Sequence, residues 1–249
     1  FENVKGLYRT LKHREFFEQI KNELASAGYI LHERLINSIE YGAPQDRERI
    51  ILVGFLDKSL AKKFEWSGQI YPNKEAFQFP WPTTNTYEED SNMECPQGIP
   101  EKLTIEYWFE KNDVINHPNA KHVFTARAGL ARFQSVEEGD DSKKSYKRLH
   151  RWRYSPTAAY GNNEVHLHPY KPRRITVAEA LAIQSLPKDF ELPADMTLSN
   201  MFKTVGNGVP YIAALGIAQS ILQHLGYSNE DNGIESGSGD FELTQKYAV

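Results

Sequence analysis

The stretch that decides the fold is YGAPQDRERIILVGF, residues 41–55. Its second half, 49–55, is rich in branched apolar residues and predicts a strand, and a similar run at 29–36 predicts another. The loop between the two strands contains Gly42 and Pro44. Roughly twelve residues without a helical pattern are too few for a parallel crossover. We therefore expect the two strands to be antiparallel neighbours at the edge of a sheet.

Three segments have the apolar spacing of helices. Residues 10–27 predict an amphipathic helix that stops at a glycine. Thr176, with Glu179 three residues later, predicts a capped helix start and a helix over 177–186. Residues 210–225 carry a proline in the first turn and a broad apolar stripe, which predicts the last helix. The pattern as a whole is that of an α/β protein.

Composition excludes several classes of protein. The chain has 249 residues, of which 40% are hydrophobic and 25% are charged. We see no run of 18 apolar residues, so we expect no membrane segment. Cys95 is the one cysteine of the sequence, which excludes an internal disulfide and a multi-cysteine zinc site and favours a reducing compartment, the cytoplasm. We expect no metal. Because the sequence starts at Phe1 with no signal segment, we also expect another segment to precede it.

The charge is uneven although the net charge is only -4. Between Lys143 and Arg174 there are nine lysines and arginines and a single acid, Glu164. Tryptophan and tyrosine residues alternate with these charges, a mixture typical of nucleic-acid contacts. The alternative is a solvated basic face that acids elsewhere balance.

Three separated stretches match one family when they are taken together. They are Phe1-Glu2-Asn3-Val4, the Gln-x-Arg-x-Arg of 45–49, and the paired segments RITVAE (174–179) and VGNGVP (205–210). Each is weak alone, but their order and spacing resemble the later motifs of the cytosine-5 DNA methyltransferases. The resemblance covers 1–56 and about 146–225 closely. It implies transfer of a methyl group from S-adenosylmethionine to carbon 5 of a flipped cytosine in a specific duplex DNA sequence, in a restriction-modification or related DNA-modification system.

The same resemblance implies a fold and a division of the chain. The fold is α/β, the C-terminal part of a Rossmann-like S-adenosylmethionine-dependent methyltransferase sheet, plus an irregular, loop-rich target-recognition domain. We expect the following segments: 1–56, the closing part of the catalytic domain; 57–173, the target-recognition region; 174–204, a small-domain segment with a helix; 205–226, a helix that returns to the catalytic domain; and 227–249, a mobile tail.

The resemblance also implies catalytic residues. Attack of a thiolate on carbon 6 of the cytosine pushes negative charge onto ring nitrogen 3 and oxygen 2. A carboxyl group can share a proton with nitrogen 3, which falls to Glu2, with Asn3 positioning its turn. A guanidinium can stabilise the charge at oxygen 2, which falls to Arg49, with Arg47 holding the loop. As alternatives, Glu2 could be a charge near a terminus and the arginines could be surface charges.

Cofactor and DNA contacts complete the expected site. Asn207 and Gly208 precede the last helix, whose free N-terminal amides could bind the carboxylate of S-adenosylmethionine. The alternative is a plain turn. We expect phosphate contacts from the basic stretch: Lys143, Lys144, Lys147, Arg148, Arg151 and Arg153.

The sequence departs from the family in one important respect. The family's Phe-x-Gly-x-Gly and Pro-Cys-Gln motifs do not occur in it, and Cys95-Pro96-Gln97 has the wrong order and lies in the variable region. We expect a missing N-terminal half, a separate subunit or the rest of a fragment, to carry the nucleophile. Two alternatives are a non-catalytic DNA-recognition or regulatory subunit and a tRNA cytosine-5 methyltransferase. The intact Glu2, Arg47 and Arg49 oppose the first, and the long recognition region favours duplex DNA over the second. The expected location is the cytoplasm of a bacterium, on the nucleoid.

Overall fold

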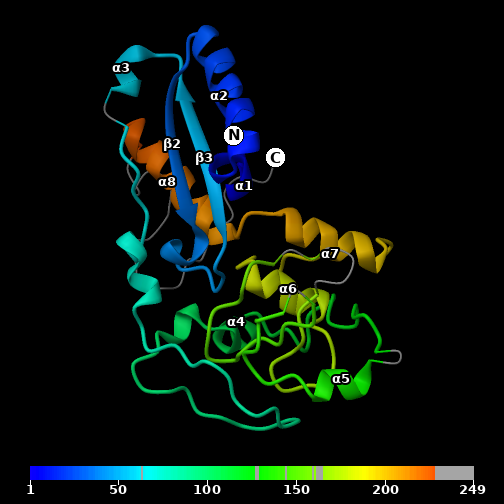
Figure 1. The fold of residues 1–249 in the computed structure, drawn as a ribbon. Coiled ribbons are helices and arrows are strands. Elements are labelled where there is room, and N and C mark those ends of the chain that lie inside the picture. The colour runs from blue at the N-terminus through cyan, green and yellow to red at the C-terminus, as the bar shows by residue number, and fades with distance from the viewer. Residues whose placement is uncertain (63, 127–128, 144, 159, 161–164, 228–249) are drawn as a thin grey trace. The chain divides into compact units, whose positions relative to one another are not determined.

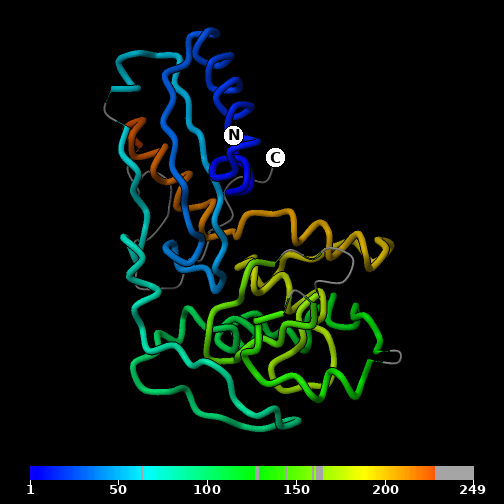
Figure 2. The backbone as a smooth tube through the Cα atoms, in the orientation of Figure 1, coloured from blue at the N-terminus to red at the C-terminus, as the bar shows by residue number. Residues whose placement is uncertain are grey.

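The computed structural model describes residues 1–62, 64–126, 129–143, 145–158, 160 and 165–227. The chain forms two compact units (Figure 2). Among the described residues, unit 1 consists of Phe1–Leu35, Ile50–Gly68 and 215–227, and unit 2 consists of Ile36–Arg49 and Gln69–Ala214. Each unit is therefore built from segments far apart in the sequence.

Most of a three-stranded sheet belongs to unit 1, while residues 36–37 and 48–49 at its strand ends belong to unit 2. Its strands are β1 (Glu2–Val4), β2 (Ile30–Asn37) and β3 (Glu48–Phe55), in the order β1-β3-β2. The nitrogen of Phe1 donates to the carbonyl of Leu52, and the Leu52 amide donates back, both at 2.9 Å. Such a reciprocal exchange belongs to an antiparallel pair. The arrows of β2 and β3 also point in opposite directions in Figure 1, which confirms the predicted antiparallel neighbours.

Helices cover both faces of this sheet because β3 alternates its side chains. Ile50 packs with Phe17 of α2 (Leu11–Ser26) and with α1 (Lys5–Arg9). Phe55 contacts His224 of α8 (Tyr211–His224), with ring centroids 5.0 Å apart, and Val53 and Ile221 pack in the same cluster. The period of two along a strand sends these two sets to opposite faces, so helix, sheet and helix form three layers, as expected for an α/β methyltransferase sheet.

Unit 2 is mostly irregular. It contains the 3-10 helices η1 (Ser38–Tyr41), η2 (Pro72–Phe77) and η3 (Glu101–Leu103) and the α-helices α4 (Ile105–Lys111), α5 (Leu130–Gln134), α6 (Val177–Ile183) and α7 (Leu198–Asn207). Every residue of α6 is buried. In the hydrophobic core of unit 2, α6 packs with α4 and α7. The Thr176 and Glu179 capping box starts α6 as predicted, although the helix ends at Ile183 rather than at 186.

Helix α7 is absent from the sequence prediction. Thr197 caps it, since its hydroxyl accepts from the Asn200 amide at 3.3 Å. Met201, Phe202 and Val205 are its buried face. Its apolar residues, Leu198, Met201, Phe202 and Val205, have the i, i+3, i+4, i+7 spacing of an amphipathic helix, so the segment 198–207 carried a periodic signal that the sequence prediction did not use.

The two compact units divide the chain differently from the predicted segments. Residues 57–68 belong to unit 1, because Phe64 and Trp66 pack beside Phe55. Residues 36–49, which include the loop between β2 and β3, belong to unit 2. The loop is tied there by main-chain hydrogen bonds from Asp46 to Ser155 and from Ser155 to Pro44, at 2.9 and 2.8 Å. The predicted mobile tail lies, apart from Tyr227, outside the described residues.

One segment of the described chain is apolar and long enough by composition to cross a membrane. An 18-residue stretch within 198–224 reaches a mean hydropathy of 1.3. The structure divides them into α7 and α8, with 10 and 14 residues. A spanning helix needs about 20 consecutive residues, so neither helix reaches that length.

Candidate active site

The loop that carries Arg47 and leads into Arg49 on β3 is closed by one asparagine. The Asn37 Oδ1 accepts from the amide of Arg47 at 3.0 Å, and its Nδ2 donates to Asp46 at 2.7 Å. Gly42 takes a φ of +92°, a left-handed conformation that suits glycine. The turn between β2 and β3 is thereby held in one shape up to the point where β3 begins.

Arg47 fastens this loop to the rest of unit 2. Its side chain is fully buried. Nη1 donates to the carbonyl of Ala158 at 3.0 Å, and Nη2 donates to that of Gly206 at 2.8 Å. Gln45 acts beside it: its amide donates to Gln184 Oε1 at 3.3 Å, and its oxygen accepts from the Ala158 amide at 3.1 Å. Gln45 therefore joins the loop to the end of α6, and Arg47 joins it to the end of α7.

The other predicted catalytic residues lie in different units. Arg49 is in unit 2, is 9% exposed and donates from Nη1 to the carbonyl of Glu48 at 2.8 Å. Glu2 and Asn3 are in unit 1 on β1. The Glu2 side chain is exposed, and the Asn3 Oδ1 accepts from the Val4 amide at 2.8 Å. The structure places each of them at a strand, where backbone hydrogen bonds limit its movement.

The expected anion site at the start of α8 is wrong for its first two amides. The Tyr211 amide donates to the carbonyl of Gln184 at 2.8 Å, and the Ile212 amide donates to the Ser185 hydroxyl at 3.2 Å. Because these donors are satisfied, they cannot bind a carboxylate. Asn207 is instead the last residue of α7.

Asn207 and Gly208 are both exposed. The neighbouring Gly206 is needed for close packing, because a Cβ there would lie 2.9 Å from the Tyr160 nitrogen. Sequence reasoning missed Gln184, whose Nε2 donates to the Val205 carbonyl at 2.6 Å and so supports this corner. Its signal in the sequence was an amide directly after the helix 177–183, which is apolar apart from Glu179.

The proposed phosphate contacts of Arg148 and Arg151 are wrong, because both side chains are buried. Arg148 lies with its Cζ 3.9 Å from the centre of the Tyr87 ring. Its nitrogens donate to five main-chain carbonyls: Phe133, Val136, His168, Pro169 and Lys171. Burial lowers its pKa to about 10. Arg151 donates to both oxygens of Glu138, at 2.9 and 2.8 Å.

The rest of the basic stretch divides between interior and surface. Arg153 is largely covered and donates to Thr83 and Gly139 carbonyls at 3.1 and 2.9 Å. Lys143 is exposed and Lys147 is partly exposed. Lys144 lies outside the described residues. Much of this stretch therefore stabilises loop-rich unit 2, where arginines bond carbonyls that no helix or strand satisfies.

Cys95 has the wrong environment for a nucleophile. Burial, and then the charge of Glu101, raise the pKa of its thiol. A raised pKa leaves less thiolate, the reactive form. Within the described ranges no three His, Cys, Asp or Glu side chains gather as metal ligands.

This fold and these motifs define an α/β methyltransferase. Residues 1–223 match the model of the C-5 cytosine-specific DNA methylase family, and the chain belongs to that family. It is 62% identical over 228 residues to the type II methyltransferase M.NmeDI of Neisseria meningitidis serogroup C, covering 90% of this chain and 53% of that protein. It is 28% identical to the type II methyltransferase M.HaeII of Haemophilus aegyptius, covering 90% of this chain and 60% of that protein.

A solved structure agrees on the fold. A protein described as a DNA modification methyltransferase encoded within a prophage of E. coli superposes with a TM-score of 0.60 at 23% identity, over 90% of this chain and 68% of that one. The chain spans little more than half the length of the curated relatives it matches.

Proposed function

We propose that the chain forms part of a DNA (cytosine-5-)-methyltransferase of a type II restriction-modification system, acting on duplex DNA in the bacterial cytoplasm. The observation that supports this most is the fastening of the loop that leads into Arg49 on β3: Gln45 bonds Gln184 at the end of α6, and Arg47 bonds Gly206 near the end of α7. A guanidinium stabilises a developing charge effectively only when it is fixed beforehand. The tied loop provides that fixation in a member of the methylase family.

Each predicted residue has one task in this proposal. The Glu2 carboxyl shares a proton with nitrogen 3 of the flipped cytosine, and Arg49 stabilises the charge at oxygen 2. Asn3 orients the turn after Glu2. S-adenosylmethionine supplies the methyl group, and the exposed Asn207 and Gly208 fit a contact with its polar end.

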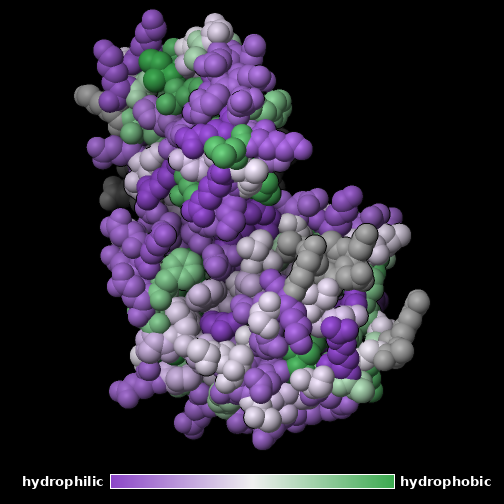
Figure 3. Space-filling view, in the orientation of Figure 1, coloured by the Kyte–Doolittle hydropathy of each residue, from purple (hydrophilic) through white to green (hydrophobic). Residues whose placement is uncertain are grey.

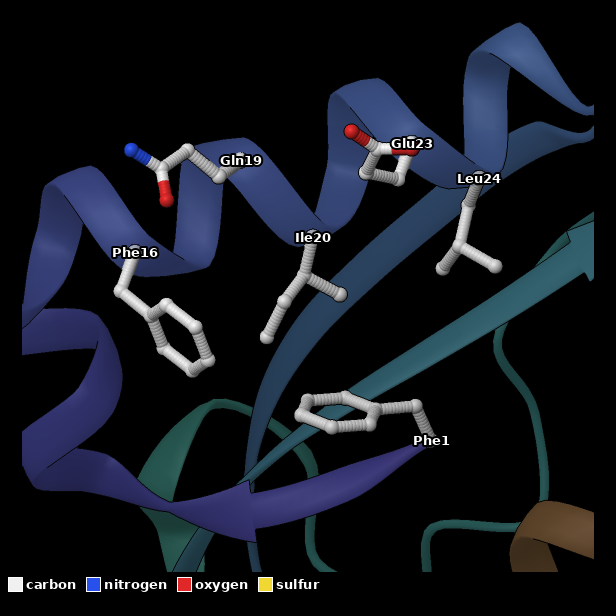
Figure 4. Close-up of a pocket in the computed structure, with 6 residues that line it drawn as sticks. All are labelled: Phe1, Phe16, Gln19, Ile20, Glu23 and Leu24. Atoms are coloured by element: carbon white, nitrogen blue, oxygen red, sulfur yellow. The ribbon is translucent and has the colours of Figure 1, made fainter.

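We propose that the attacking thiol comes from a segment outside these 249 residues, in the same polypeptide or in another one. A surface for that segment lies on unit 1. Phe1, Phe16, Ile20 and Leu24 line a groove of about 510 Å³, with Gln19 and Glu23 also in its lining (Figure 4). Phe1 and Phe16 are 50% and 58% exposed, and Figure 3 shows hydrophobic patches that interrupt an otherwise hydrophilic face of this unit.

The occupant we propose for the groove is the thiol-bearing segment of the enzyme. Two observations support it. The chain covers 53% of M.NmeDI, so that relative has a large further part with no counterpart among these 249 residues. Strand β1 is at an edge of the described sheet, beside the groove, and an open strand edge favours pairing with a further strand.

The test is methylation of duplex DNA by the complete enzyme. Glu2→Gln and Arg49→Ala should each lower single-turnover rates by about 100-fold, while DNA binding is retained. Glu15→Gln and Arg14→Ala, on the exposed part of α2, are the matched controls. Near-normal rates in both site variants would refute the roles. Methylation of tRNA alone, or of no nucleic acid, would refute the proposed function in favour of the tRNA enzyme or the regulatory subunit.

A further inference from the structure

Two arginines of unit 2 flank a single tyrosine ring. The Cζ of Arg132, on α5, lies 4.7 Å from the centre of the Tyr146 ring. The Cζ of Arg174 lies 5.7 Å from the same ring and 5.5 Å from the Phe124 ring. Arg132 is exposed, and Tyr146 and Arg174 are partly exposed. Two cations thus converge on one aromatic side chain at the surface.

These two arginines differ from the neighbouring ones in their partners. Arg151, Arg153 and Arg173 each bond a carboxylate. Within the described part of the chain, no acid lies within ion-pair distance of the guanidinium of Arg132 or Arg174. Stacking against a ring face leaves the N–H edges of a guanidinium pointing outward. The cluster therefore presents two uncompensated fork-shaped donors.

The backbone at Tyr146 is strained to keep this arrangement. Its φ is +60°, in the left-handed region that a bulky residue rarely adopts. The ring also packs against Phe133, with centroids 5.4 Å apart. Strain of this kind persists where surrounding structure holds it and is concentrated at functional sites.

The buried Arg148 supplies that surrounding structure. Two residues after Tyr146, it bonds the carbonyl of Phe133, next to Arg132. It also bonds the carbonyl of Lys171, three residues before Arg174, at 3.1 Å. One internal guanidinium therefore ties together the segments that carry all three members of the cluster.

We propose that Arg132 and Arg174, held by Tyr146, bind phosphate oxygens of the DNA backbone. The inference rests on the proposed function, because it takes duplex DNA as the substrate. Phosphate accepts two parallel hydrogen bonds from a guanidinium fork. Two guanidinium groups that already stack on a ring lose little side-chain freedom when they bind phosphate. For this role they are therefore better suited than a flexible lysine.

The experiment measures duplex binding by the complete methyltransferase, using fluorescence anisotropy at several salt concentrations. Arg132→Ala and Arg174→Ala should each reduce the log-log salt slope by about one unit, and the double variant by about two. Affinity for cognate and unrelated duplexes should fall by the same factor. Tyr146→Ala should weaken binding and Tyr146→Phe should not, because the ring face carries the contact. Arg14→Ala is the matched control, since Arg14 stacks on Tyr8 at 5.7 Å in unit 1.

The outcomes separate this inference from the proposed function. Unchanged slopes in correctly folded variants, with normal methylation by the parent enzyme, would overturn the inference alone. Loss of binding to the cognate duplex only would also overturn it, because it would assign the cluster to base reading. A parent enzyme that binds duplex DNA without methylating cytosine would refute the proposed function while leaving the phosphate contact testable. Circular dichroism melting of each variant verifies that it is folded.

Discussion

Replacing Arg47 should destabilise unit 2 strongly. The side chain is fully buried and donates to the Ala158 and Gly206 carbonyls at 3.0 and 2.8 Å. A hydrogen bond from a charged donor contributes about 1.5–3 kcal/mol. Arg47→Ala removes two such bonds and leaves two buried acceptors, so we expect the free energy of unfolding to fall by about 3–6 kcal/mol. Arg47→Lys can reach one of the two carbonyls, so it should lose about half as much.

Urea unfolding followed by tryptophan fluorescence is a suitable assay. Three of the four tryptophans, Trp81, Trp108 and Trp152, belong to unit 2. The exposed Arg14→Ala serves as control and should change the free energy of unfolding by less than about 0.5 kcal/mol. A loss below about 1 kcal/mol for Arg47→Ala would show that the carbonyls find other donors, and the proposed fastening of the loop would be wrong.

Three further predictions follow from the buried and reactive groups. Arg148→Met should lower the free energy of unfolding at least as much as Arg47→Ala, because it removes bonds to five main-chain carbonyls rather than two; a small effect together with a changed salt slope would instead identify Arg148 as a phosphate contact. Burial, and to a smaller extent the charge of Lys147, lower the pKa of His166 from 6.5 to about 3. Between these two pH values His166 binds a proton in the unfolded chain but not in the folded one. The stabilisation from keeping this ring neutral is complete above about pH 6.5 and is lost as the pH falls towards 3, by about 1.4 kcal/mol per pH unit. The urea midpoint should therefore change less between pH 7 and pH 5 in His166→Gln than in the parent protein. An equal change in both proteins would contradict the assignment. Cys95→Ser should leave methylation by the complete enzyme unchanged, whereas a 5-fluorocytosine adduct mapped to Cys95 by mass spectrometry would overturn the prediction that its thiol is not the nucleophile.

Local sequence patterns were sufficient to predict the elements that depend on interactions between residues close in the chain. The two strands at β2 and β3 and the Thr176 cap were predictable because alternation, short loops and caps act between residues close in the chain. The family followed from short motifs in a set order, and the match over residues 1–223 confirms it. Helix α7 was missed although the apolar residues at 198, 201, 202 and 205 have helical spacing.

The tertiary structure decided which charges are buried. In the sequence Arg148 and Lys143 belong to one basic stretch, yet the first is fully buried and the second is exposed. The structure also decided that the first amides of α8 are already bonded, and that Arg47 reaches Gly206, 159 residues away. Burial and hydrogen-bond partners depend on segments distant in the chain, whereas periodicity and capping depend on neighbours. The sequence could therefore indicate the chemistry of each residue, and only the fold could determine what surrounds it.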